Sequence, residues 1–218
     1  TLATEAQILG WERGDDELTI IPPPNWADDG EGGYVYLPPA ATLNGVSADT
    51  FDGKDISNLQ FDDIKDLSKY HLSSFDPTAM SGFGIGQVAN IDPMAIGGFR
   101  ADHFASFAPS ALAGFDHTHV AAFEPTAVSG FDPQHIASFD TAAVSGFSKE
   151  HFASFELTAI EGFNPLHVAA FDPEAMAGFN GTQLKELAPE SFAAITEDQA
   201  ANLPPEAAAA FKNWVLPK

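Results

Sequence analysis

The stretch DPTAMSGFGIGQVANIDPMAIGGFRADHFASF, residues 76–107, decides the fold of this chain. It divides into four blocks of eight residues, each ending in Phe or Ile. The same phase continues in both directions without an insertion, from Asp52 to Phe211, which gives 160 positions and 20 blocks. Chance does not keep an eight-residue phase over such a length, so residues 52–211 form an internal repeat.

The apolar residues of each block fall at positions 5 and 8, and position 4 is often Ala, which is helical spacing rather than strand alternation. Proline breaks a helix interior but suits the first helical residue. It recurs at position 2, as Pro77, Pro93, Pro109, Pro125, Pro133, Pro165, Pro173, Pro189 and Pro205. The sequence therefore predicts a mainly α solenoid of very short helices, one per block.

Residues beside these prolines fit the start of a short helix. Asp132 and Asn164, like most residues before a proline, carry side chains that cap free backbone N–H groups. A helix of about five residues is unstable alone, so burial of positions 5 and 8 against neighbouring coils has to hold it.

A sixteen-residue period lies over the eight-residue one. Position 7 is Gly in alternate blocks, where we expect a residue that tolerates the left-handed conformation at a helix end: Gly82, Gly98, Gly114, Gly130, Gly146, Gly162 and Gly178. The blocks between them carry His or Gln at position 4: His71, Gln87, His103, His119, His135, His151, His167, Gln183 and Gln199. The simplest coil with this super-repeat has sixteen residues, although a coil of four blocks gives the same periods.

The row of histidines raises the question of a metal or cofactor site. Equivalent side chains of stacked helices lie roughly 8–10 Å apart, whereas two imidazoles that share a zinc ion each place a nitrogen about 2.0–2.1 Å from it. Gln also replaces His in this position, and an amide replaces imidazole better as a hydrogen-bonding group than as a metal ligand. We therefore expect each His or Gln to satisfy backbone groups at a corner. His117, beside His119, leaves an isolated surface metal site as an alternative.

Residues 1–51 differ in kind from the repeat. TIIPPPNW (19–26) and YVYLPP (34–39) predict short extended pieces. The acidic stretch between them contains Asp28, Asp29 and Glu31, whose oxygens suit calcium. Their spacing does not match an EF-hand loop, and we favour an acidic surface turn.

Both ends of a repeat array need a cover for their apolar residues. We expect residues 1–51 to cover the first coil or to dock on a partner. The tail 212–218, with Trp214, Val215 and Leu216, is expected to cover the last coil.

Composition excludes several classes of function. Nine Lys and Arg against 31 Asp and Glu give a net charge of −22, which argues against nucleic acid and anionic membranes as partners. No stretch approaches the length of a membrane span, and there is no cysteine. The chain has neither a glycine-rich phosphate loop nor a G-x-S-x-G motif, and most carboxylates stand at helix starts. We therefore expect a protein that is not an enzyme and has no cofactor.

The blocks GIGQVANI, NGTQLKEL and TEDQAANL resemble the octapeptide tract L-x-x-x-Q-V-x-A-L of large repetitive bacterial proteins, many of them predicted to be exported. Gln87, Gln183 and Gln199 occupy its Gln position. The central blocks depart from it, with Phe for Leu and His for Gln. The resemblance implies a surface or extracellular structural role, and it brings no catalytic residues.

These observations predict a structural protein that assembles with itself or with other subunits into a filament, a surface layer or part of an adhesin. The chain starts at Thr1 rather than Met, which we interpret as removal of a leader and export to the bacterial surface. Two alternatives stay open. One is a module that binds polysaccharide, or a metal or cofactor on the histidine row; the other is an accessory subunit of a larger assembly.

Overall fold

The computed structural model describes residues 26–28, 34–36 and 42–215. The chain divides into two compact units, Thr1–Ala41 and Thr42–Lys218. In the first unit β1 (Trp26–Asp28) pairs with β2 (Tyr34–Tyr36) in antiparallel register. Strand β2 falls in a piece predicted to be extended, whereas β1 shares only Trp26 with the other piece and includes Asp28 of the predicted acidic turn. Asp29 and Glu31 lie outside the described residues, so the calcium hypothesis stays a prediction.

The second unit begins with a small hairpin that lies ahead of the repeat. Strands β3 (Thr42–Leu43) and β4 (Val46–Ser47) pair through a turn at Asn44 and Gly45, whose φ angles are 52° and 79°. Two positive φ angles in succession are what a two-residue hairpin turn requires. The short helix η2 (Ala48–Thr50) follows, and Leu43 and Ala48 are buried. Residues 42–51 thus cover the first coil.

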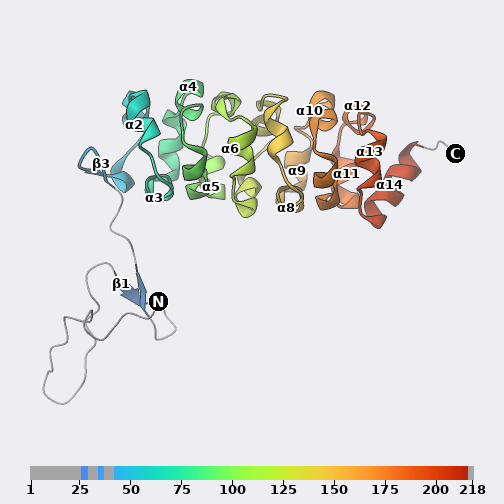
Figure 1. Cartoon of the computed structure of the whole chain (residues 1–218), viewed down its shortest axis with the longest axis horizontal. Helices are drawn as coiled ribbons and strands as arrows, with labels where there is room; N and C mark the ends of the chain where they lie inside the picture. The colour runs from blue at the N-terminus through green and yellow to red at the C-terminus, as the bar shows by residue number, and fades with distance from the viewer. Residues whose placement is uncertain (1–25, 29–33, 37–41, 216–218) are drawn as a thin grey trace, which may run out of the picture. The chain divides into compact units, whose positions relative to one another are not determined.

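The blocks are numbered 1–20 from Asp52. The odd-numbered blocks form α-helical segments. These are α1 (Gly53–Asn58), α3 (Lys69–Ser74), α4 (Ile85–Val88), α5 (Ala101–Phe104), α6 (His117–Ala121), α7 (Pro133–Ala137), α8 (Lys149–Ser154), α10 (Pro165–Ala170), α11 (Gly181–Glu186) and α13 (Glu197–Ala201). This succession of short helices confirms the predicted fold class (Figure 1).

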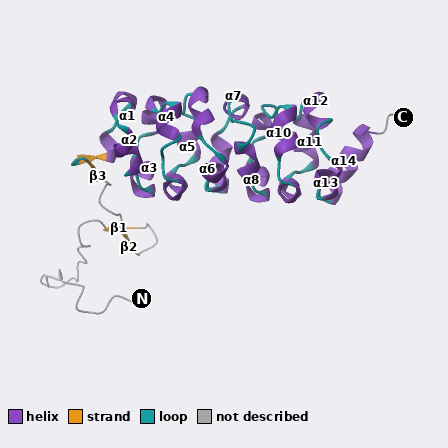
Figure 2. Cartoon of the chain, turned by 45° about the horizontal axis from the view of Figure 1, so that its top comes forward, coloured by secondary structure: helices purple, strands orange, loops and turns teal. Residues whose placement is uncertain are grey.

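Six of the even-numbered blocks form 3₁₀ helices instead: η3 (Pro77–Gly82), η4 (Pro93–Gly98), η5 (Pro109–Gly114), η6 (Pro125–Gly130), η7 (Ala143–Gly146) and η8 (Pro173–Gly178). The other four form α-helical segments: α2 (Phe61–Lys65), α9 (Leu157–Ile160), α12 (Pro189–Phe192) and α14 (Pro205–Val215). Extended corners separate the helices along the whole second unit (Figure 2).

The block beginning at Asp132 shows why the chain turns at each corner. One carboxylate oxygen of Asp132 accepts hydrogen bonds from the backbone N–H groups of Gln134 (2.8 Å) and His135 (2.9 Å), and Pro133 is the first helical residue. The block ends when the N–H of Phe139 bonds to the carbonyl of Ile136 at 3.2 Å. Cap and proline therefore start the helix, and the next extended corner stops it.

Phenylalanine rings from positions 5 and 8 fill the core. The centroid of Phe104 lies 4.7 Å from that of Phe123 and 4.6 Å from that of Phe131. Phe152 stacks on Phe179 at 4.3 Å. Each of these rings comes from a different block, so burial joins segments that are separate in sequence, and a buried ring of this size contributes about 1.5–3 kcal/mol.

The turn of the solenoid differs from the sixteen-residue coil expected above. The ring of His103 bonds to Phe75, 28 residues earlier, and Gly130 lies against Ala101, 29 residues earlier. One turn therefore takes about three and a half blocks. Helices of adjacent turns that contact each other are three blocks apart in sequence: α5 contacts η3, three blocks earlier, and η6, three blocks later. Because three is an odd number, each even-numbered block contacts odd-numbered blocks. Even-numbered and odd-numbered blocks therefore have different neighbours and different sequences, which accounts for the sixteen-residue period.

The glycines at position 7 also have another role than the one predicted. Within the described residues, positive φ occurs only at Asn44 and Gly45. A Cβ on Gly98 would lie 2.2 Å from the carbonyl oxygen of Lys69, and one on Gly130 would lie 1.9 Å from that of Ala101. Glycine is therefore needed because the backbones of adjacent turns approach too closely for any side chain.

The last helix, α14, is longer than the others and lies at the C-terminal end of the second unit (Figure 1). It packs on α11, and Phe211 stacks on Phe192 at 5.3 Å. The helix runs into the predicted tail, although the side chains of Trp214, Val215 and Leu216 lie outside those described. Among the described residues, no helix has the length and apolar character to cross a membrane.

Candidate functional site

The polar row is the candidate site, and it consists of the position-4 side chains of the odd blocks from block 3 to block 19: His71, Gln87, His103, His119, His135, His151, His167, Gln183 and Gln199. His103 is fully buried, Gln87 to Gln199 are all at most 9% exposed, and only His71 is part-exposed. Each side chain stands at the third residue of its short helix, above the corner that precedes it.

Within its own block, each of these side chains except His167 caps the start of the helix. The Nδ1 atom of His103 accepts from the N–H of Arg100 at 3.1 Å, and that of His151 accepts from the N–H of Ser148 at 2.9 Å. In Gln183 the Oε1 atom takes the same place. This is half of a capping box, with imidazole in the position where Glu or Gln is usual.

The far end of each side chain reaches the adjacent turn. Nε2 of His103 lies 3.0 Å from the carbonyl oxygen of Phe75, and Nε2 of His151 lies 2.9 Å from that of Phe123. The amide of Gln183 donates to two carbonyls, those of Phe152 (2.7 Å) and Phe155 (3.2 Å). One side chain thus joins a helix start to the end of a block four blocks earlier.

These bonds define the form of the buried rings. In His103 and His151, Nδ1 accepts from a backbone N–H and Nε2 faces a carbonyl, which favours the neutral ring with its hydrogen on Nε2. Burial lowers the pKa of His103, His151 and His167, while the facing carbonyls raise it to a smaller extent. His167 differs in one respect, since its Nδ1 has no hydrogen-bond partner.

The residue at position 1 changes the surroundings of Nδ1. An oxygen of Asp116 lies 2.8 Å from Nδ1 of His119, and one of Asp132 lies 3.0 Å from Nδ1 of His135. Burial would raise the pKa of Asp116, but hydrogen bonds from Thr118 and the N–H of His119, with the nearby imidazole, lower it to about 2. This cap therefore stays ionised well below neutral pH.

The structure does not assemble the metal site that the sequence left as an alternative. His117 is exposed, while His119 is buried with its Nε2 on the carbonyl of Ile91 at 2.8 Å, so the two imidazoles do not share a surface. Within the described residues, no group of three or more His, Cys, Asp or Glu side chains could hold a metal ion. Binding a metal on the row would break hydrogen bonds that hold the turns.

Ser191 is a member of the bridging set that the sequence analysis missed. Its hydroxyl donates to the carbonyl of Phe163, 28 residues earlier, at 2.7 Å, and the side chain is 1% exposed. It stands at position 4 of an even block, where Ala79, Ala95 and Ala111 stand in others. A hydroxyl in an otherwise alanine position was the signal that could have identified it.

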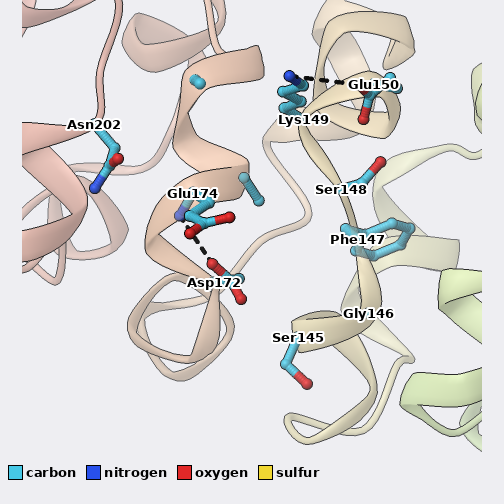
Figure 3. A pocket seen from close by; sticks show the side chains of 11 residues that line it. Ser145, Gly146, Phe147, Ser148, Lys149, Glu150, Asp172, Glu174 and Asn202 are labelled. Atoms are coloured by element: carbon cyan, nitrogen blue, oxygen red, sulfur yellow. Dashed lines mark hydrogen bonds and ion pairs between the residues drawn. The ribbon is translucent and has the colours of Figure 1, made fainter.

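A surface groove of about 420 Å³ lies where η7 and α8 approach η8 (Figure 3). Ser148, Lys149, Glu150 and Asp172 line it, and Lys149 Nζ lies 3.8 Å from Glu150 Oε1. A groove of about 340 Å³ repeats the arrangement eighty residues earlier, with Ser68, Lys69 and Asp92 in the corresponding positions.

Both grooves are open to solvent, and the serine at position 1 in each of them is the N-cap residue of a helix. Ser148 Oγ does lie 3.0 Å from His151 Nδ1. The same position 1 holds Arg100, Asp116 and Gly84 in other blocks, so its shared role is to start the helix. A search of protein-family models finds no match to this chain, and a comparison with curated proteins finds no significant relative.

Proposed function

We propose that this chain is a non-enzymatic structural protein of the bacterial exterior, a subunit of a filament, surface layer or adhesin. The observation that carries the proposal is the use made of the polar row. Except for His167, its buried members bond to the backbone of this chain at both ends of the side chain, so they serve to fix the spacing of the turns. A row of that kind supports length and rigidity rather than chemistry.

Exposed apolar residues support association through the sides of the solenoid. The hairpin at residues 42–51 and helix α14 cover the two ends of the repeat, which disfavours stacking through open coils. Large apolar side chains are exposed along the sides instead: Phe61, Tyr70, Ile85, Met94, Leu157 and Leu166. Met94 is 88% exposed, the highest value among them.

Negative-stain electron microscopy with light scattering, with and without calcium, tests this proposal. We expect regular fibres or sheets, weakened when Met94→Ser and Leu166→Ser are combined. Lys54→Ser, an exposed position, is the matched control. Single rods at every protein and calcium concentration would contradict self-assembly and would favour an accessory subunit of a larger complex. Fibres that form only with calcium would point to Asp28, Asp29 and Glu31.

The two related grooves favour one alternative, a module that binds a polysaccharide. Repeated Ser, Lys and Asp side chains at an open surface offer hydrogen bonds to hydroxyl groups and charge to uronic acids. Calorimetry with neutral and acidic polysaccharides tests it. Lys69→Ala combined with Lys149→Ala should remove binding and leave the fold intact, whereas Lys54→Ala should bind as the unchanged protein does.

A further inference from the structure

The buried histidines of the polar row differ in the residue that precedes them at position 1, and this residue affects what happens when the ring is protonated. A rung is a position-4 histidine together with the backbone groups that it bonds. The residue at position 1 of the same block lies beside Nδ1, except at His167, where Nδ2 of Asn164 lies 3.3 Å from Nε2 instead. This residue is Arg100 for His103, Asp116 for His119, Asp132 for His135, Ser148 for His151 and Asn164 for His167.

Protonation of a buried ring adds a hydrogen to Nδ1, the atom that accepts from a backbone N–H. At His103 that hydrogen would face the N–H of Arg100, with the guanidinium close by and only Asp102 and Asp76 to oppose the charge. Two donors then point at each other in a buried site, and the cap bond is lost. The ring has to leave its place, which also breaks the bond to Phe75.

At His151 and His167 the difficulty is a buried charge with no carboxylate bonded to the ring, since the hydroxyl of Ser148 can turn to accept from Nδ1 and Nδ1 of His167 has no cap bond to lose. At His151 both the N–H and the hydroxyl of Ser148 face Nδ1, and the nearby carboxylates are Glu150 and Glu124. At His167 the nearby acidic group is Asp140. Nδ1 of His167 has no hydrogen-bond partner in the structure. No carboxylate oxygen is hydrogen-bonded to Nδ1 in either rung.

Aspartate caps reverse this outcome. Asp116 Oδ1 lies 2.8 Å from Nδ1 of His119, and Asp132 Oδ1 lies 3.0 Å from Nδ1 of His135. A hydrogen added to Nδ1 there becomes the donor of a charge-assisted bond, and the Nε2 bond to the adjacent turn is retained. Gln87, Gln183 and Gln199 make the same bridges and do not titrate.

We propose that the polar row is an acid-responsive link between turns, in which the residue at position 1 decides whether a rung opens. The rungs at His103, His151 and His167 open on protonation, while those at His119 and His135 and the glutamine bridges hold. Mild acid therefore weakens the contacts between turns at His103, His151 and His167, and leaves the contacts made by the glutamines of the last turns intact.

The direction of the pH effect follows from the buried rings. Burial holds the pKa of His103, His151 and His167 below the ordinary value of 6.5. The unfolded segment then binds more protons than the folded one, so the stabilisation is complete above about pH 6.5 and is lost as the pH falls below it. For each such rung, the opening equilibrium rises by up to about tenfold per pH unit.

Amide hydrogen exchange followed by mass spectrometry tests the proposal on the whole chain. Rates at about pH 7.5 and about pH 5 are compared after correction for intrinsic exchange. We expect α5, α8 and α10 to lose at least about tenfold in protection, with α6, α7 and α11 nearly unchanged. An equal loss in all six helices, or no loss in α5, α8 and α10, would overturn the proposal.

Two single changes make the test specific. His151→Gln keeps both bonds and removes the titrating ring, so α8 should resist acid. Ser148→Asp keeps the ring and supplies a carboxylate beside Nδ1, so α8 should resist acid here too. If α8 still loosens in His151→Gln, the row is not the sensor. If it still loosens in Ser148→Asp, position 1 does not decide the response. Circular dichroism at about pH 7.5 establishes that both variants fold.

Discussion

The Nε2 atom of His103 lies 3.0 Å from the carbonyl oxygen of Phe75, twenty-eight residues earlier in the chain. The other nitrogen of the same ring accepts from the N–H of Arg100 at 3.1 Å. One buried side chain therefore starts a helix and ties it to the adjacent turn. The recurrence of this arrangement along the row makes the spacing of the turns a property of individual side chains.

Replacing His103 tests how much one rung contributes. His103→Leu fills the space but leaves the carbonyl of Phe75 and the N–H of Arg100 buried without partners. Each unsatisfied group costs about 1–3 kcal/mol, so we expect the free energy of unfolding to fall by about 2–6 kcal/mol. His103→Gln should cost less than about 1 kcal/mol because Gln makes both bonds elsewhere in the row. Urea denaturation at neutral pH measures both, and equal losses would contradict the bridging role.

Neighbouring glycines of η4 give a matched pair. Gly98→Ala places a Cβ 2.2 Å from the carbonyl oxygen of Lys69, so the two turns have to separate. We expect a loss of about 1–3 kcal/mol or more. At Gly97 the nearest atom is a flexible oxygen of Glu124 at 3.4 Å. Gly97→Ala should therefore be neutral or stabilising by up to about 1 kcal/mol. Thermal denaturation measures the stability of both variants. Equal melting temperatures would show that the backbones of the two turns are not in close contact at Gly98.

Asp116 should contribute stability that depends on pH. Its pKa is about 2 in the folded chain against 3.8 ordinarily, so its contribution is complete above about pH 3.8 and disappears as the pH falls toward 2. The side chain is 60% exposed, so solvent screening limits the effect to about 1 kcal/mol or less.

Asp116→Asn, which keeps a capping oxygen, should therefore be less stable near pH 6, with a difference that shrinks below about pH 4. Urea denaturation at several pH values measures it. Asp62→Asn, at a side chain that is 99% exposed, is the control and should show no such trend. A difference that persists unchanged at low pH would contradict the charge argument.

Phe211 tests the cover at the C-terminal end. Its ring stacks on Phe192 at 5.3 Å, and removing it exposes apolar surface of the last turn. Phe211→Ala should lower the stability of the last blocks by about 1–3 kcal/mol and increase association through that end. Lys212→Ala, at the adjacent exposed position, should do neither. Hydrogen exchange of α11 and α14 together with light scattering measures the two effects.

Several features were predictable because they are local. Pro133 and its cap Asp132 stand next to each other in sequence, and a proline preceded by a capping residue starts a helix wherever it occurs. Apolar residues at positions 5 and 8 identify the buried side of each block. The His and Gln residues at position 4 of the odd blocks could be identified as one row because they recur every sixteen residues.

The role of the glycines was not predictable from the blocks alone. Gly98 looks like a helix stop in sequence, since glycine commonly ends helices in the left-handed conformation. Its actual constraint is the carbonyl of Lys69, twenty-nine residues away, which no local rule connects to it. In the same way, Ser191 became a bridging residue only when the carbonyl of Phe163 was placed beside it.

The sequence by itself determined where the helices start, which residues are apolar and which positions are polar, because caps, prolines and periodicity act within one block. Only the tertiary structure decided that a turn takes three and a half blocks, that Gly98 lies against Lys69, and that His103 reaches Phe75. The reason is that the rotation at each corner is set by packing, and the sum of these rotations fixes which blocks meet. That sum depends on packing in three dimensions, not on the period of the sequence.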